Sequence, residues 1–457
     1  MTTPAPVTGV TRDEELLRLV HAWMAQHGRG GSGAGARAVG TTGDGSDRTR
    51  RTGGSDAGAG ATEEAVHLQE VEVLRAGRPG LVDVVTQVGD RLLHLVLGVR
   101  RPGEEAHLLR AGDDPVLGLL EDAEGLGVVV DALRDTELAR LVLESVHGGG
   151  GAVDPGPPAP VSDDDDGAVL AFGEDCTLTV FSWLPHGPHP GVELLVALDE
   201  VGFNHLAAPL ALWRRGGRDL GLVQEGLAGS AGGWALALTS LRDLYAAGGP
   251  PEAAGGDFAP EARALGTMTA RMHLAMDRAF GRRSGEIRHW AEVVEGVVRT
   301  SEPSLLDGEG VHEALEMLKA SGLKASTLRT HGDFHLGRTA RTNQGWVVAD
   351  FMPGGIPPGS DAPVFRSPLA DVADMLWSLH HVASVAALER DPTGRSGLAG
   401  LAQAWEARNR RAFLTGYLAT PGIGGLVPSD RRIVRGLAAV FEAERGALRS
   451  GGSQAAS

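Results

Sequence analysis

The sequence predicts an α+β protein with two lobes, a smaller one that mixes strands and helices and a larger one that is mainly helical. Apolar runs typical of strands gather before residue 230, and helical spacing of apolar residues dominates after it. Two stretches rich in glycine and poor in large apolar side chains flank a further strand-rich region. One stretch precedes this region, and the other separates it from the small lobe. The expected segments are 1–27 (helix), 28–64 (disordered linker), 65–147 (N-terminal cap), 148–167 (acidic linker), 168–229 (small lobe), 230–448 (helical lobe) and 449–457 (disordered tail).

The composition bounds the class of protein. The chain has 457 residues, of which 42 % are hydrophobic, so it can bury a large core in two or three domains. A formal net charge of −17 argues against nucleic acid or an anionic membrane surface as the main partner. The single cysteine, Cys176, excludes a disulfide framework and a Cys-rich metal site. Because no stretch approaches the ~20 apolar residues of a membrane span and the first residues lack a signal-peptide pattern, we expect a soluble cytoplasmic protein.

The first third of the chain should alternate between order and disorder. Residues 12–26 carry apolar side chains at helical spacing, which predicts a helix. Residues 28–64 contain almost no large apolar side chains, so they cannot bury enough surface to offset the entropy of ordering. In the cap, we predict strands at 66–74, 81–88 and 91–99 and a helix at 131–146.

The remaining elements follow the acidic linker, whose four consecutive aspartates indicate a solvated loop. In the small lobe, strands are predicted at 168–172, 177–183 and 221–225, with a helix at 191–200. In the large lobe, helices are predicted at 235–247, 261–280, 284–298, 311–320, 369–387, 401–418 and 430–448.

Two aspartates in the large lobe carry the strongest chemical signal. Asp333 lies in the turn HGDFHLGR (331–338), and Asp350 follows the strand-like GWVVA 17 positions later. Either aspartate alone is equally compatible with a helix cap or a turn. Together they suit phosphoryl transfer, in which one carboxylate accepts the proton of an attacking hydroxyl and the other holds the Mg²⁺ that bridges the nucleotide phosphates.

Two histidines, His331 and His335, flank Asp333. Imidazole is a common metal ligand, but the sequence offers no third ligand at useful spacing. Hydrogen bonds that hold the loop rigid are the preferred interpretation. A mixed lobe before a larger helical lobe that carries such a loop is the layout of a protein-kinase-like fold with the nucleotide in the cleft.

Several motifs together point to a family. In the large lobe they are HGDFHLG (331–337), GWVVADF (345–351), SPLADVADML (367–376), LGTMTARMH (265–273) and NRRAF (409–413). Earlier in the chain they are DPVLG (114–118), VDALRD (130–135) and FSWLPHGPHPGVE (181–193). With these motifs the chain resembles, over roughly residues 65–448, the bacterial maltokinases of the aminoglycoside phosphotransferase and choline-kinase-like group.

The resemblance implies ATP-dependent phosphorylation of maltose to maltose 1-phosphate on a route to α-glucan and glycogen. ATP and Mg²⁺ are the implied cofactors, and an enzyme of trehalose or glucan metabolism is a candidate partner. By matching position, Asp333 would be the catalytic base and Asp350 a Mg²⁺ ligand. Glu193 would be the helix carboxylate that pairs with a small-lobe lysine, and Gln224 and Glu225 would lie at the hinge beside adenine.

Three positions depart from the family pattern. Thr179 stands where the lysine of the nucleotide site belongs, and the chain's two lysines, Lys319 and Lys324, come only much later. Arg338 replaces a glutamine that would help bind metal, although a guanidinium has no acceptor atom. Residues 352–357 lack two acidic positions of the family. These departures describe a degraded ATP and Mg²⁺ site, in which Arg338 either replaces a metal ion or touches the phosphates directly.

Three functions therefore remain open. The first is a sugar kinase that resembles maltokinase. The second is a pseudokinase with weak or no turnover that binds a ligand or regulates a partner. The third is a kinase for another sugar or an amino sugar, since the acceptor side has changed.

Overall fold

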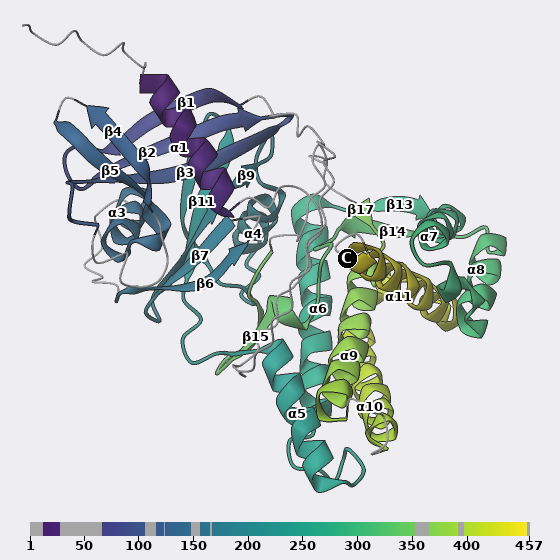
Figure 1. Cartoon of the computed structure of the whole chain (residues 1–457). Helices are drawn as coiled ribbons and strands as arrows, with labels where there is room; N and C mark the ends of the chain where they lie inside the picture. Colours follow the sequence, from purple (N-terminus) through teal and green to yellow (C-terminus); the bar gives the residue numbers. More distant parts are fainter. Residues whose placement is uncertain are drawn as a thin grey trace, which may run out of the picture.

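The computed structural model describes residues 12–27, 66–105, 116–122, 124–147, 156–164, 167–351, 365–391 and 397–454. The predicted linker 28–64 and the altered stretch 352–357 lie outside these ranges. Figure 1 shows a strand-rich half, which contains the cap and the small lobe, beside a helical half. The predicted α+β, two-lobed, kinase-like architecture is confirmed.

The cap is a six-stranded antiparallel sheet in the order β1-β2-β3-β5-β4, with β9 paired to β3. Strands β2 and β3 are buried along almost their whole length, because both of their faces are covered. One face of the sheet packs against helix α1, and the other packs against helix α3 and the small lobe. The bounds are α1 Arg12–His27, β1 Val66–Arg75, β2 Gly80–Val88, β3 Arg91–Arg100, β4 Val116–Asp122, β5 Gly125–Asp131, α3 Thr136–His147 and β9 Trp183–Leu184.

The small lobe is a five-stranded sheet in the order β10-β11-β8-β7-β6 with helix α4 beside it. Strand β6 falls inside the predicted acidic linker, so the structure differs from that expectation. An edge strand tolerates the proline residues and polar side chains of this segment, because one of its sides pairs with no neighbouring strand. The bounds are β6 Pro158–Asp164, β7 Gly167–Phe172, β8 Cys176–Phe181, α4 Pro190–Glu200, β10 Pro209–Arg215 and β11 Arg218–Glu225.

The cap and the small lobe share one hydrophobic core, which joins strands β2, β3 and β5 and helix α3 of the cap to strands β7, β8 and β11. Ion pairs reinforce this contact at its edge. The guanidinium of Arg215 lies 2.9 Å from Glu70, 2.7 Å from Glu72 and 2.6 Å from Asp83. The two sheets therefore form one packed unit.

The large lobe contains the seven helices that the sequence predicted, within a few residues at each end. Helices α6 and α10 pack so closely that only glycine fits at position 266. A Cβ atom on Gly266 would lie 2.0 Å from the carbonyl oxygen of Phe413. Helix α11 runs from the outer edge of the lobe back to the centre of the molecule (Figure 1). The bounds are α5 Gly233–Ala247, α6 Ala259–Phe280, α7 Ile287–Ser301, α8 Glu309–Ala320, α9 Leu369–Arg390, α10 Leu398–Leu418 and α11 Arg431–Gln454.

Two expectations for the large lobe were wrong in detail. The first residues of the predicted helix 284–298 form strand β13, because they pair with β14 in a small sheet. The predicted tail from 449 onward continues helix α11 as far as Gln454. Within the described ranges, no helix has the length and apolarity needed to cross a membrane.

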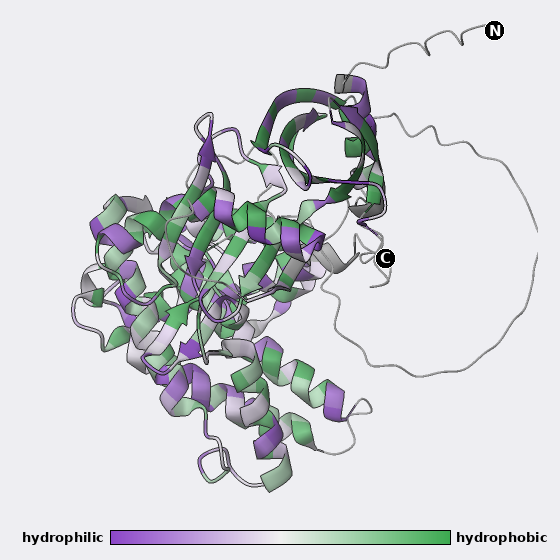
Figure 2. Ribbon diagram, turned by 90° about the vertical axis from the view of Figure 1, so that its left-hand side faces the viewer, coloured by the Kyte–Doolittle hydropathy of each residue, from purple (hydrophilic) through white to green (hydrophobic). Residues whose placement is uncertain are grey.

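Two three-stranded sheets lie at the junction of the lobes, in the orders β12-β15-β16 and β13-β14-β17. Asp333 follows β14 and Asp350 follows β16, so these sheets fix both carboxylates relative to each other. In Figure 2, the strands at the centre of the molecule consist mainly of hydrophobic residues. The bounds are β12 Ala231–Gly232, β13 Arg283–Glu286, β14 Lys324–Arg329, β15 Thr339–Thr342, β16 Gly345–Val348 and β17 Phe365–Arg366.

Candidate active site

The loop that carries Asp333 is held by a buried carboxylate from helix α9. Asp371 accepts hydrogen bonds from the backbone amides of His331 and Gly332, each at 2.9 Å. Gly332 has φ +84°, a left-handed conformation that favours glycine. The loop therefore needs both a glycine and a buried acceptor to present Asp333.

Asp371 is itself held from helix α6. His273 Nε2 lies 3.1 Å from its carboxylate, and His273 Nδ1 lies 2.9 Å from the hydroxyl of Tyr417. Burial alone would raise the pKa of Asp371, but the hydrogen bond and charge of His273, the charge of His331 and a loop amide together lower it. Asp371 therefore stays ionised and acts as a fixed acceptor.

Asp333 is buried and surrounded by cations. Its carboxylate lies 3.1 Å from Arg338, 3.1 Å from Arg449 and 3.5 Å from His335, and it also forms an ion pair with Arg445. Burial would raise its pKa, but His335 and Arg445 together hold the pKa of Asp333 far below its usual range. Asp333 is therefore an anion at any physiological pH.

The structure brings the two predicted carboxylates together through one side chain. Arg338 donates to Asp350 from Nη1 and to Asp333 from Nη2, so a single guanidinium bridges both. Burial would lower the pKa of Arg338, but the two carboxylates raise it. The group between the carboxylates is a permanent cation.

These residues do not fit a resident Mg²⁺ ion. Magnesium requires several oxygen ligands in octahedral geometry, and a guanidinium supplies none. Across the described ranges, no three His, Cys, Asp or Glu side chains are placed to hold a metal ion together. Asp350, the predicted Mg²⁺ ligand, is paired with the guanidinium of Arg338.

The helix carboxylate Glu193 has a different partner from the one implied by the family pattern. The guanidinium of Arg329, at the end of β14, lies 3.4 Å from Glu193 and donates to the carbonyl of Pro190 at 3.1 Å. Thr179 lies on β8 opposite Leu222 of β11. The cation beside Glu193 is therefore an arginine of the large lobe.

The hinge residues end strand β11, where the chain passes to the large lobe. The side-chain amide of Gln224 donates to the carbonyl of Ala207 at 3.2 Å, and the backbone of Glu225 donates to that of Ala208 at 2.8 Å. The side chain of Glu225 is exposed. Their contact with adenine stays a prediction.

The two loop histidines make local contacts. His331 Nε2 lies 2.9 Å from the backbone carbonyl of Asp350, which ties the loop to the end of β16. Burial lowers the pKa of His331. His335 Nδ1 accepts from the amide of Gly337 at 3.1 Å. Both contacts are of the kind that holds a loop rigid.

Sequence reasoning missed four residues of this site. Arg445 and Arg449 come from helix α11, and Arg449 falls in the predicted tail. Asp371 belongs to the motif SPLADVADML but received no role, and Arg329 received none either. The spacing of the arginines, four apart on a helix, was visible, but nothing local indicated which face they would present.

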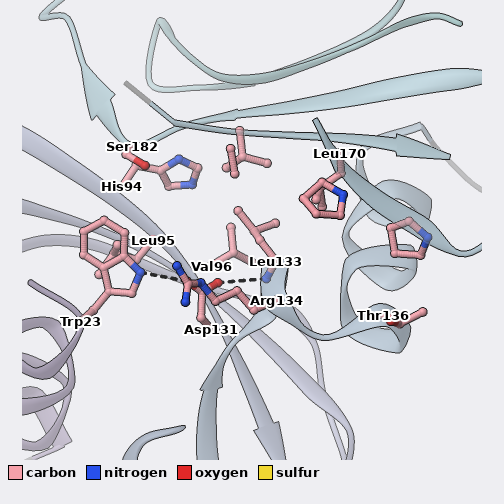
Figure 3. Close-up of a pocket in the computed structure, with 14 residues that line it drawn as sticks. Trp23, His94, Leu95, Val96, Asp131, Leu133, Arg134, Thr136, Leu170 and Ser182 are labelled. Atoms are coloured by element: carbon pink, nitrogen blue, oxygen red, sulfur yellow. Dashed lines mark hydrogen bonds between the residues drawn. The ribbon is translucent and has the colours of Figure 1, made fainter. Parts of the chain in front are cut away.

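A separate cavity of about 400 Å³ lies between the cap and the small lobe (Figure 3). Trp23 of α1 donates from its indole to Asp131 at 3.0 Å beside it. Val180 of β8 lines the cavity, so the adjacent Thr179 points to the opposite face of the sheet. Asp333 is not among the residues that line this cavity.

Comparison with known proteins gives sugar kinases as relatives. No protein-family model matches the chain. It is 28 % identical to a glucosamine kinase from Mycolicibacterium smegmatis over 244 residues, which is 50 % of this chain and 59 % of that protein. It is 28 % identical to a glucosamine kinase from Streptacidiphilus jiangxiensis over 251 residues, which is 50 % of this chain and 54 % of that protein. The chain thus spans little more than half the length of these curated relatives.

Solved structures give the same group. A glucosamine kinase (crystal form A) matches with a TM-score of 0.61 at 20 % identity, covering 84 % of this chain and 87 % of that one. A glucosamine kinase in complex with glucosamine, ADP and inorganic phosphate matches with a TM-score of 0.57 at 21 % identity, covering 86 % and 90 %. These relatives are glucosamine kinases rather than the maltokinases expected from the motifs. The chain therefore has the kinase-like fold of glucosamine kinase, and its curated relatives phosphorylate a sugar.

Proposed function

We propose that this chain is an ATP-dependent kinase for an amino sugar of the glucosamine class. The observation that carries the proposal is the pair Asp333 and Asp350, which one guanidinium bridges at the junction of the lobes. The curated relatives support the amino sugar over maltose. A solved relative of the same fold is described in complex with glucosamine, ADP and phosphate.

The proposed reaction is an in-line transfer. A sugar hydroxyl oxygen forms a bond to the γ-phosphorus of ATP, the bond from that phosphorus to the β–γ bridging oxygen breaks, and the hydroxyl proton passes to a carboxylate oxygen of Asp333. Because its pKa lies far below normal, Asp333 is a weak base. Its contribution is to orient the hydroxyl and to take the proton late, when the new bond has made the hydroxyl acidic.

A test measures ADP release by the purified chain with ATP and glucosamine, glucose or maltose in separate reactions. We expect glucosamine to give the highest kcat/KM. Asp333→Asn should lower turnover by at least ~100-fold, because an amide cannot accept the proton. Asp307→Asn is the matched control. Asp307 is exposed and ends a 3-10 turn outside the site, so this variant should leave turnover unchanged.

Two outcomes would contradict the proposal. A preference for maltose would return the assignment to the maltokinases. Equal turnover in the Asp333→Asn variant would remove Asp333 from the chemistry. The fold of that variant should be checked by circular dichroism, because Asp333 takes part in three ion pairs with arginine.

One observation favours a second candidate, a ligand-binding protein without turnover. Arg338 already pairs with both carboxylates, and Thr179 stands where the maltokinase pattern has its phosphate-binding lysine. Binding of ADP and glucosamine without any ADP release from ATP would support this candidate and exclude the first.

A further inference from the structure

Three arginines converge on Asp333 from two distant parts of the chain. Arg338 belongs to the loop itself, whereas Arg445 and Arg449 lie one turn apart on helix α11. Each has a guanidinium nitrogen in contact with the Asp333 carboxylate. Arg445 also lies 3.8 Å from Asp374 of helix α9. We call Arg338, Arg445 and Arg449 the arginine cluster.

We propose that the arginine cluster is a metal-independent binding site for the phosphate groups of a nucleotide, with Arg338 in the role of the divalent cation. The inference rests on the proposed function only in taking a nucleotide as the ligand. It adds that phosphate oxygens, rather than a metal ion, are what this site is built to receive.

The donor inventory supports this assignment. The Nε atoms of Arg338 and Arg445 are buried and donate to no group of the described chain. A buried donor without an acceptor is unfavourable because it has lost its hydrogen bonds to water, so these atoms favour a ligand that supplies oxygens. Phosphate offers several acceptor oxygens, and its pairing with a guanidinium is commonly bidentate.

The charge balance also favours an anion. The three arginines face Asp333, Asp350 and Asp374. Burial raises the pKa of Asp374 to about 7, so this carboxyl is partly protonated at neutral pH. Wherever Asp374 is protonated, the three guanidinium groups outnumber the carboxylates that they contact, Asp333 and Asp350, which favours an anion over a metal ion.

The position of Arg338 explains why it, and not the helix arginines, takes the place of the cation. It is the residue of the cluster that contacts both Asp333 and Asp350. The cations that neutralise the phosphates during transfer are held by an acidic side chain of the site, and Arg338 contacts Asp350 in this way. A guanidinium is a permanent cation with a planar fork of donors, so it can meet phosphate oxygens there without any metal.

The test is calorimetric titration of ADP into the full chain, once with EDTA and once with MgCl₂. We expect the two Kd values to agree within about threefold, because guanidinium–phosphate contacts need no metal. Arg338→Gln removes the cation and supplies a side-chain oxygen. We expect it to weaken ADP binding in EDTA by ~10-fold or more, and MgCl₂ should restore part of the loss.

The matched control is Arg341→Gln on the adjacent strand β15. Arg341 pairs with Glu261 at 2.8 Å, away from the cluster, so this variant removes one positive charge without touching the site. It should bind ADP like the parent chain in both buffers. Arg338→Lys, which keeps the charge but loses the fork, should fall between the parent and Arg338→Gln.

Three outcomes would overturn the inference. If the parent chain binds ADP at least tenfold more tightly with MgCl₂ than with EDTA, the site uses a metal, although the kinase proposal survives. If Arg338→Gln binds ADP in EDTA as tightly as the parent, Arg338 is not a phosphate ligand. If the parent binds ADP in neither buffer, both this inference and the kinase proposal fail.

Discussion

At the scale of single residues, the geometry of the site depends on a carboxylate that touches no substrate. Asp371 is fully buried and accepts hydrogen bonds from two backbone amides of the Asp333 loop. Its carboxylate also contacts the imidazole of His273. Removing one partner of a buried hydrogen bond leaves the other with its full desolvation cost. Asp371 is therefore a positioning residue for Asp333.

We expect Asp371→Ala to destabilise the protein by about 3–5 kcal/mol, because it leaves the amides of His331 and Gly332 and the buried imidazole of His273 without an acceptor. Urea denaturation followed by circular dichroism measures this loss. Asp371→Asn keeps one acceptor oxygen and should cost less. Asp307→Ala, the same substitution at an exposed position, should leave the free energy of unfolding almost unchanged. An equally large loss of stability in this variant would show that the burial of Asp371 is not the cause.

The two aspartates to which we assign the proposed chemistry could be singled out because their signal is local. Asp333 and Asp350 lie in short motifs, and a turn and a hairpin bring them together. Arg445 and Arg449 could not be predicted, because they lie 112 and 116 positions from Asp333 along the chain. Only the packing of α11 against α9 brings them to the site.

At the scale of elements, helix α4 begins on an unusual cap. His189 is buried, stacks on Phe181 with ring centroids 4.2 Å apart, and accepts from the amide of Gly191 at 3.2 Å. An acceptor at this position satisfies one of the free amides at the helix start. The helix that carries Glu193 thus depends on a neutral imidazole.

The pKa of this cap predicts a loss of stability in acid. Burial lowers the pKa of His189 from 6.5 to about 4. Between these values the unfolded chain takes up a proton that the folded chain refuses, so the free energy of unfolding falls as the pH is lowered. The full effect is about 3 kcal/mol and is complete near pH 4.

Urea denaturation of the parent chain and of His189→Asn at several pH values measures this contribution. Asparagine caps a helix without titrating, so the variant should lose less stability than the parent between pH 6.5 and 4. Parallel pH profiles of the two proteins would contradict the assignment to His189.

Elements were predictable where their pattern was periodic over several turns or several alternations. The long helices α6, α9 and α10 have such patterns and were found within a few residues. Strands β6 and β13 were not found, because proline and aspartate dominate β6 and the four residues of β13, RSGE, show no apolar alternation. They are strands only because β7 and β14 offer partners, and pairing of this kind is not local information.

At the scale of the whole molecule, the first helix completes the cap from across an interval of 38 residues. Leu16, Leu19 and Val20 of α1 are buried against strands β2 to β5. The helix was predicted, but its place on the cap was not. It covers a sheet face that would otherwise expose a continuous apolar surface.

We expect Leu19→Ala to destabilise the cap by about 2–4 kcal/mol, because it opens a cavity under a helix that is 3 % exposed at this position. Hydrogen exchange of the β2 and β3 amides should rise in proportion. Leu126→Ala on β5 of the same sheet is the matched control, since Leu126 is 51 % exposed. Equal effects of both changes would show that α1 does not support the cap.

The sequence by itself determined the two-lobed α+β architecture, most helices and the pair Asp333 and Asp350, because periodicity and short motifs act through neighbours along the chain. Against the pattern of the maltokinases that it resembles, the sequence also has Thr179 and Arg338 in place of a lysine and a glutamine. Only the tertiary structure decided which cations lie beside Glu193 and Asp333. Arg329 meets Glu193, and Arg338, Arg445 and Arg449 surround Asp333, because the packing of distant elements alone determines which charges become neighbours.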